Sequence, residues 1–359
     1  MSNFGRPDFT SPPGFSGNIA IAGIGAVSPA GWGVPALSQA LVENQVWPTS
    51  ELTRPGWTTS LAVRPVPGLE KRPPHLAHAR LRRTSSVSQF AVAAALEALG
   101  SMADEVRAEK LRLGVVLCVM SGCVNYSRRF YDEVLREPAT ASPLVFPETV
   151  FNAPASHLAA LLGTRAINYT LVGDPGTFLQ GVALGTGWLL QNEVDACVVV
   201  GAEEIDWLTA DAYQIFNRAV VLSEGAGAVC LRRAQIGAHE VTLKAITSSH
   251  NYSRGLGPRE ACRRMRDELL KSGRADILCD GTQGEERLDR PELIAWKGWQ
   301  GERLSPKNLM GEGLAAASAW QCVAAIEALI RRGYGSAYVS VVGCNQQAIG
   351  AHFARENAE

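Results

Sequence analysis

The sequence lacks a long hydrophobic run and a surplus of charge of either sign. No stretch of about eighteen apolar residues is present, so no segment is expected to span a bilayer. The 34 basic and 35 acidic residues give a net charge of -1, which argues against a nucleic-acid partner held by overall charge. Residues 1–17 carry no apolar signal core, and we therefore expect a cytoplasmic protein without a membrane partner.

Metal-binding and nucleotide-binding patterns are also missing. The chain has eight cysteines, but none form a CxxC pair, and no histidine lies at zinc-site spacing from such a pair. Several cysteines lie in apolar runs, such as Cys197, and are expected to be buried, reduced thiols. The chain has no P-loop, HExxH or GxSxG pattern, and the segment 23–25 lacks the third glycine of a dinucleotide fingerprint. We expect neither a metal nor a cofactor.

Hydrophobic residues make up 46% of the 359 residues, which is enough for a large core. Apolar runs predict strands at 18–24, 113–120, 167–172, 196–201, 226–231, 241–246, 277–279 and 338–342. Helical periodicity predicts helices at 35–43, 86–99, 178–190, 258–271 and 313–331. Gly23 and Gly25 predict a tight turn after the first strand, and the proline-rich stretch 45–76 predicts a long surface loop.

Strands and helices alternate in two passes, which indicates an α/β fold with two related halves. We expect an N-terminal arm at residues 1–16, a first half at 17–235 and a second half at 236–359.

Four segments, in this order and spacing, resemble the β-ketoacyl-ACP synthase family. Residues 19–29 are similar to its opening strand and turn, and residues 194–203 to its strand ending in Gly-Gly-Ala-Glu. Residues 223–229 are similar to its Gly-Glu-Gly-Ala-Gly-Ala stretch, and residues 307–317 to its Lys-Ser-x-x-Gly-His-Thr-x-Gly-Ala-Ala motif. The resemblance implies a thiolase fold, in which two related βα halves form a layered αβαβα core.

Catalytic members of the family use a cysteine nucleophile at the start of a buried helix, together with two histidines. The family's spacing places the nucleophile at Pro175 and the two histidines at Asp280 and Glu312. The lysine before the second histidine is kept as Lys307, whose partner would now be a carboxylate, and the phenylalanine that gates the acyl pocket falls on Cys344. Because these positions depart together, we expect no catalytic residue at this degenerate site.

Pro175 has neither a nucleophile nor an N–H for an oxyanion. With Asp174 before it, it predicts an ordinary helix start, in which Asp174 is the N-cap and Pro175 the first helical residue.

The resemblance therefore implies a chain-length factor, a non-catalytic subunit that pairs with an active ketosynthase and shapes the acyl tunnel. Such a heterodimer would serve type II polyketide, polyene or fatty-acid-like biosynthesis, and strand 167–172 would pair with the partner's equivalent strand. An acyl carrier protein bearing a polyketide or fatty acyl chain would be the second partner, with Arg128 and Arg129 as its contacts. Candidates for the tunnel or interface are Met120, Ser121, Cys123, Tyr126, Phe130 and Tyr169, although core packing explains Tyr126 and Phe130 equally well.

Two alternatives stay open at this point. A diverged thiolase-fold enzyme (an acyltransferase, hydrolase or decarboxylase) would use Asp280 and Glu312, facing one pocket near Lys307, for acid–base chemistry. A homodimeric scaffold would instead bind acyl groups or a carrier protein without any chemistry.

Overall fold

The computed structural model describes residues 19–54, 56–165, 167–235, 240–253 and 256–355, so the expected arm at 1–16 lies outside the described residues. The main sheet has the strand order β13-β12-β14-β15-β10-β1-β9-β7-β5-β6. Its first half contains β1 (Ile19–Ser28), β5 (Leu113–Val119), β6 (Asn168–Val172), β7 (Ala196–Glu203) and β9 (Gly225–Arg233). Its second half contains β10 (Val241–Ile246), β12 (Ile277–Cys279), β13 (Glu302–Leu304), β14 (Ser336–Val342) and β15 (Gln347–Arg355). The short strands β2 (Gly31–Trp32) and β11 (His250–Asn251) pair with β1 and β15.

The two halves repeat one strand pattern. In the first, β5 pairs in parallel with β6 and β7, and β9 and β1 follow antiparallel. In the second, β12 pairs in parallel with β13 and β14, and β15 and β10 follow antiparallel. The halves meet where Ala20 of β1 lies opposite Thr242 of β10. The prediction of two related halves is confirmed, and we propose on this basis that their boundary lies near residue 235.

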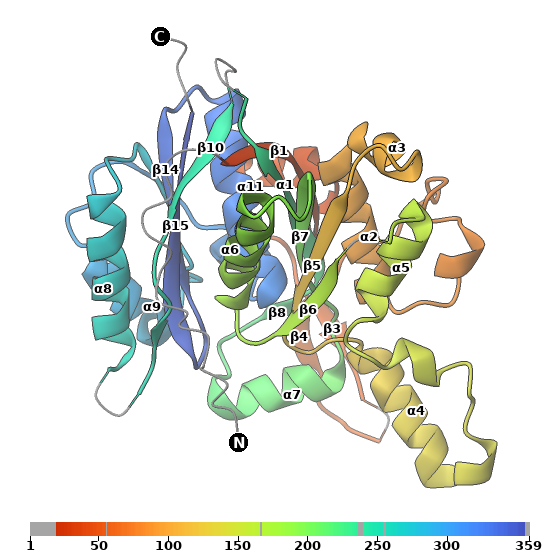
Figure 1. Ribbon diagram of the computed structural model, residues 1–359. Coiled ribbons are helices and arrows are strands. Elements are labelled where there is room, and N and C mark those ends of the chain that lie inside the picture. The colour runs from red at the N-terminus through yellow and green to blue at the C-terminus, as the bar shows by residue number, and fades with distance from the viewer. Residues whose placement is uncertain (1–18, 55, 166, 236–239, 254–255, 356–359) are drawn as a thin grey trace, which may run out of the picture.

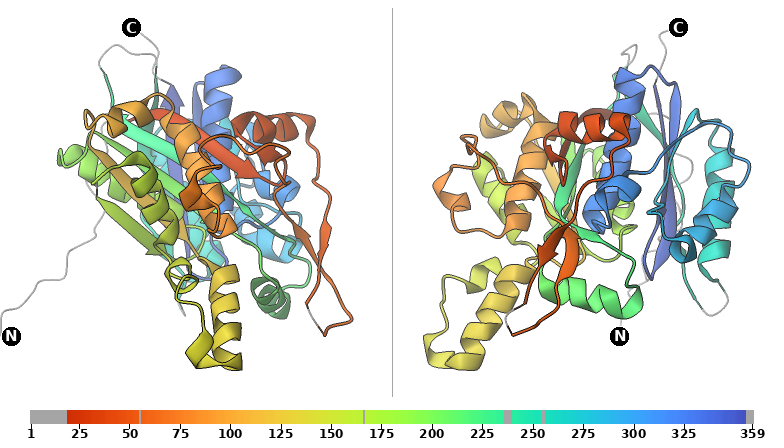
Figure 2. Two further views of the ribbon diagram at one scale, coloured as in Figure 1. Left: turned by 90° about the vertical axis from the view of Figure 1, so that its right-hand side faces the viewer. Right: turned by 180° about the vertical axis from the view of Figure 1, so that it is seen from behind.

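The helices complete five layers (Figure 1). The helices α2 (Ser86–Leu99) and α5 (Ala153–Leu162) cover the outer face of the first half, whereas α8 (Pro258–Lys271) and α9 (Glu286–Ala295) cover that of the second. Between the two sheet halves lie α6 (Thr177–Leu190) and α11 (Ala315–Arg331), as the view from behind also shows (Figure 2). This is the layered αβαβα core that was expected.

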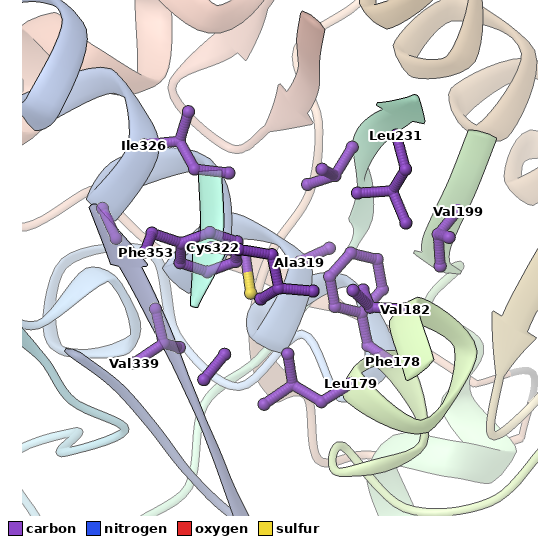
Figure 3. Close-up of a cluster of buried hydrophobic side chains, with 14 of the residues drawn as sticks. Phe178, Leu179, Val182, Val199, Leu231, Ala319, Cys322, Ile326, Val339 and Phe353 are labelled. Carbon is purple, nitrogen blue, oxygen red and sulfur yellow. The ribbon is translucent and has the colours of Figure 1, made fainter. Parts of the chain in front are cut away.

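The central helices fill the space between the sheet halves with apolar side chains. Phe178, Leu179 and Val182 of α6 face Ala319, Cys322 and Ile326 of α11, with Val199, Leu231, Val339 and Phe353 from the strands around them (Figure 3). Because the strands between helix layers are buried on both faces, they are continuous apolar runs, which explains why they could be predicted. As expected, the cysteines are free thiols; seven are buried, and Cys344 alone is exposed.

The prediction of a turn at Gly23 and Gly25 was wrong, since both lie inside β1. A Cβ at Gly23 would lie 2.2 Å from the carbonyl oxygen of Ala98, and one at Gly25 would lie 2.0 Å from that of Ala94. The backbone of α2 therefore lies directly on the strand, and only glycine leaves room for it.

The prediction of a surface loop at 45–76 was also incomplete. The stretch contains β3 (Ser50–Leu52) and β4 (Leu61–Arg64), which form a small second sheet with β8 (Leu222–Ser223). The side chains of β3 and β4 are mostly exposed, so these strands have only a weak apolar pattern. Their partner strand β8 is remote in the sequence, and the small sheet was therefore not predicted.

Several helices were not predicted: α3 (Met102–Arg107), α4 (Val124–Arg136), α5, α7 (Trp207–Phe216), α9 and α10 (Pro306–Met310). The helix α4 is rich in charged residues and buries only Val124, and α9 contains Pro291 in its interior, so neither stands out as a core helix from its sequence. The remaining helix, α1 (Val34–Glu43), agrees with its predicted range.

Gly185 and Gly187 of α6 are two residues apart but have different surroundings. A Cβ at Gly185 would lie 2.6 Å from the Sγ of Cys197, whereas open space surrounds one at Gly187. We expect Gly185→Ala to lower the free energy of unfolding by about 1–3 kcal/mol through overpacking. Gly187→Ala should raise it by about 0.5–1 kcal/mol through helix propensity. Urea denaturation measures the free energy of unfolding of both variants. If Gly187→Ala were destabilised more than Gly185→Ala, this account of the packing would be contradicted.

Candidate functional site at the start of helix α6

Four of the positions identified from the sequence, Pro175, Lys307, Glu312 and Cys344, lie near the start of α6. The Pro175 carbonyl oxygen accepts a 2.6 Å hydrogen bond from the Ser318 hydroxyl of α11. Cys344, in the loop between β14 and β15, lies within electrostatic range of Glu312, Asp174 and Lys307. Although Cys344 is exposed as a residue, desolvation of its thiol by the surrounding groups is the main cause that raises its pKa to about 11, and the two carboxylates add to the rise. A thiol with so high a pKa is protonated at neutral pH and is a poor nucleophile.

The prediction that Asp174 is the N-cap was wrong, because the N-cap of α6 is Gly176 and no described side chain caps the helix. Asp174 instead holds the turn that precedes the helix. Its carboxylate accepts a hydrogen bond from the N–H of Gly176 at 3.1 Å, and its carbonyl oxygen accepts one from Thr177 at 2.9 Å. The α-helix itself begins at Thr177, so Pro175 lies in the preceding turn and not in the first helical position. Because Pro175 carries no thiol and no N–H, this helix start has neither the nucleophile nor one of the donors that a condensing site requires.

Asp280 follows β12 and is completely buried. One carboxylate oxygen accepts hydrogen bonds from the hydroxyls of Thr282, at 2.8 Å, and Ser305, at 2.7 Å. The other forms an ion pair with Arg303 at 3.2 Å. Both oxygens are thus engaged, and the charge partner of Asp280 is Arg303 rather than Lys307.

Lys307 and Glu312 form a buried ion pair, which fits the expectation that this lysine would have a carboxylate partner. Lys307 is 4% exposed and Glu312 is 3% exposed. The second Glu312 oxygen accepts a 2.8 Å hydrogen bond from the N–H of Leu314. Burial alone would lower the pKa of Lys307, but the carboxylates of Glu312 and Glu292 outweigh it and raise the pKa. The lysine is therefore held in its charged form.

Glu292, Arg303 and Tyr213 complete the polar centre and were not identified from the sequence. Glu292 of α9 accepts hydrogen bonds from the Ser340 hydroxyl and the Gly281 N–H; burial, and then the neighbouring Asp280, raise its pKa to about 8. Burial, and then Glu312 and Cys344, raise the pKa of Tyr213 on α7. Glu292 and Tyr213 lie on helices that were not predicted, and no local pattern marks Arg303 as a partner of Asp280.

Two buried glutamates at the end of β7 hold the loop that follows β5. Glu203 accepts hydrogen bonds from the N–H groups of Met120 and Ser121, and Glu204 accepts one from Asn125 at 2.9 Å. Burial raises the pKa of Glu203 to about 8 and that of Glu204 to about 7. The candidate tunnel loop therefore has a fixed backbone.

The other tunnel candidates are divided among three places. Cys123 is buried in the core between the sheet, α2 and α5. On α4, the Tyr126 hydroxyl donates to the Arg83 carbonyl oxygen at 2.5 Å, and the centroids of the Phe130 and Phe146 rings are 5.4 Å apart. Tyr169 lies on β6 and packs against Trp188 of α6, with ring centroids 5.3 Å apart. Met120, Ser121 and Cys123 thus share one loop, whereas Tyr169 lies on a separate strand.

Arg128 and Arg129 both have acidic partners. Arg128 forms ion pairs with Asp206 at 2.7 Å and with Asp132 at 3.4 Å, and Arg129 pairs with Glu133 at 3.2 Å. Arg128 therefore connects α4 to the start of α7.

The strand β6 ends the main sheet, and within the described part of the chain no strand pairs with its outer edge. Tyr169 and Val172 on this strand are 53% and 56% exposed. The helix α4 projects from the lower end of the body (Figures 1 and 2). Further exposed apolar side chains lie on α4 and in the segment after it: Tyr131, Leu135, Leu144, Phe146, Val150 and Phe151. We call β6 and these residues the apolar face.

Among the described helices, none has the length and apolar character needed to cross a bilayer.

Comparisons with known proteins agree with this architecture. The family model for the β-ketoacyl synthase N-terminal domain matches residues 16–236, whereas no curated protein sequence matches the chain. The ishigamide ketosynthase/chain length factor is similar in structure, with a TM-score of 0.79 and 18% identity over 95% of this chain and 100% of that chain. A ketosynthase in complex with its chain length factor from Xenorhabdus doucetiae gives a TM-score of 0.74 and 16% identity over 99% and 100%. A β-ketoacyl synthase from Burkholderia phymatum gives 0.78 and 16% over 95% and 100%. These are thiolase-fold proteins, and the thiolase fold expected from the sequence is confirmed.

The buried Lys307–Glu312 pair gives a direct test of the centre. We expect Glu312→Gln to lower the free energy of unfolding by about 3–5 kcal/mol, because it leaves the Lys307 charge buried without a counterion. The double variant Lys307→Met, Glu312→Leu should recover most of this loss, since it removes both charges. Glu327→Gln, which breaks a pair with the exposed Arg331, is the control and should cost less than about 1 kcal/mol. Equal losses in Glu312→Gln and Glu327→Gln, measured by urea denaturation, would contradict the account.

Proposed function

The chain belongs to the β-ketoacyl synthase family, and we propose that within it the chain is a non-catalytic, chain-length-factor-like subunit. It pairs with an active ketosynthase and shapes the acyl tunnel in type II polyketide, polyene or fatty-acid-like biosynthesis. The observation that carries the proposal is the start of α6, where Pro175 stands at the place of the nucleophile. The carboxylates at the two histidine places, Asp280 and Glu312, are each paired with a cation.

The ion pairs also weigh against a diverged enzyme that uses these carboxylates. A general base needs a free carboxylate within reach of a substrate proton. Both oxygens of Asp280 are occupied by Arg303 and by hydroxyl groups, and both oxygens of Glu312 are occupied by Lys307 and a backbone N–H. Neither carboxylate is free to take up a proton from a substrate.

The apolar face supports pairing with a ketosynthase. Stable subunit interfaces bury large, mostly apolar areas, and an unpaired strand edge is a template for another strand. The face combines both features, since β6 has a free edge and exposed Tyr169 and Val172. The similar structures of the ishigamide system and of Xenorhabdus doucetiae each pair a ketosynthase with a chain length factor.

A basic strip beside α4 supports docking of an acidic carrier protein. Lys71, Arg72, Arg80, Arg82 and Arg83 are exposed, and none forms an ion pair with another described residue. The Tyr126 hydroxyl connects the strip to α4 through the Arg83 carbonyl. Unpaired surface cations raise the association rate of an acidic partner, whereas Arg128 and Arg129 are already neutralised.

The pairing is tested by co-expression with the ketosynthase encoded beside this chain. We expect a 1:1 complex in size exclusion with light scattering, and loss of its condensation activity when the nucleophilic cysteine of the ketosynthase is replaced. Val172→Asp places a charge on the edge of β6 and should weaken the complex at least tenfold. Val42→Asp, at an equally exposed apolar position on α1, should not. If no complex forms, or if both variants bind equally well, the pairing is refuted.

The basic strip gives a separate prediction for the carrier protein. Arg80→Glu with Arg82→Glu should weaken binding of acyl-loaded carrier protein to the complex about tenfold or more, and most strongly at low salt. Arg259→Glu with Lys271→Glu, at exposed positions on α8 at the other side of the molecule, is the matched control, since neither residue forms an ion pair with another described residue (Figure 1). Fluorescence anisotropy of labelled carrier protein measures both. An equal fall in affinity for the two variants would show that only overall charge matters.

A further inference from the structure

Asp174 connects the start of α6 to the loop 343–347, which lies between β14 and β15. One carboxylate oxygen accepts hydrogen bonds from the N–H of Gly176 and from the side-chain amide of Gln347, both at 3.1 Å. The other accepts from the N–H groups of Gln346, at 3.1 Å, and Gln347, at 3.3 Å. In return, the N–H of Asp174 donates to the side-chain oxygen of Gln346 at 3.3 Å. One buried carboxylate thus binds two segments that are remote in the sequence.

The loop 343–347 and the residues just before α6 lie so close together that glycine is needed at the contact. A Cβ at Gly343 would lie 1.7 Å from the Asp174 carboxylate, so glycine is required there. A Cβ at Gly176 would lie 2.8 Å from the Gln347 side chain. The Gln347 side chain is in turn held by Gln180 of α6 at 3.1 Å. The loop therefore lies directly on the helix start and leaves no room for another group between them.

The helix start has an electrostatic preference that the carboxylate satisfies. The N-terminus of a long helix attracts negative charge, because its first N–H groups have no intrahelical partner. Asp174 is completely buried, and its carboxylate lies at this end of the fourteen-residue α6. The position that favours an anion is therefore filled by a carboxyl group of the protein itself.

We infer that Asp174 is a latch that holds the loop 343–347 closed over the start of α6. That the group excluded by this latch is an acyl chain rests on the proposed function. With the loop held in this way, the acyl chain that grows on the partner ketosynthase cannot enter this subunit past Cys344. It has to extend along another route, such as the subunit interface. The latch itself is a property of this chain alone.

The test is hydrogen exchange of the isolated chain, resolved to single amides. The amides of Gly343 and Tyr252 report on the loop without forming a hydrogen bond to Asp174, since they donate to the carbonyl oxygens of Gln347 and Gln346. Asp174→Asn replaces one acceptor oxygen by an NH₂ group, which is a donor and cannot accept a hydrogen bond from the N–H groups of the loop. We expect exchange at Gly343 and Tyr252 to become at least tenfold faster, and labelling of the exposed Cys344 by N-ethylmaleimide to become at least threefold faster.

Asp206→Asn is the matched control, because Asp206 is also a buried aspartate just before a helix: it accepts from the N–H of Leu208 at the start of α7 and has no bond to the loop. It should change neither reporter. If Asp174→Asn does not fold, Gln347→Ala removes one bond to the latch and should still accelerate exchange at Gly343 about threefold. Unchanged exchange at Gly343 in a folded variant overturns the latch. A failure to pair with a ketosynthase would refute the proposed function and leave this result standing.

Discussion

The centre of this protein depends on the rule that a buried charge needs a counterion. Removing an ion from water costs several kcal/mol, and a buried ion persists only where a partner of opposite charge and further hydrogen bonds offset that cost. Lys307 has Glu312, and Asp280 has Arg303. Such pairs are rigid, because movement of either partner exposes the other charge to an apolar medium. These polar groups are therefore engaged in contacts within the protein.

The fold explains why these pairs lie where they do. The two halves repeat one βα pattern, and their central helices α6 and α11 fill the space between the sheets with apolar side chains. The charged groups described here lie near the ends of these helices, where loops from both halves meet. Asp174 before α6 and Glu312 before α11 occupy equivalent ends, and each uses its carboxylate to bind backbone N–H groups as well as a side chain. The groups at these two helix ends are therefore held by several bonds each.

Much of the fold follows from the sequence alone, but its tertiary partners do not. The ranges of α2, α8 and β10 agree with prediction because their apolar patterns are strong. The helices α4, α7 and α9 were missed, and with them Tyr213 and Glu292. Gly23 and Gly25 were assigned to a turn, since the backbone that requires them is that of α2, some seventy residues away. The family's spacing located Pro175, Asp280, Lys307, Glu312 and Cys344, but only the structure revealed Arg303 and the bonds from Asp174 to the loop 343–347.

The central claim is that this chain never carries the acyl group covalently. The most direct measurement is intact-protein mass spectrometry of the complex with its ketosynthase after incubation with acyl-loaded carrier protein. The account predicts that the mass of the acyl group is added to the ketosynthase and that the mass of this chain does not change. An acyl adduct on this chain, above all on Cys344, would contradict it.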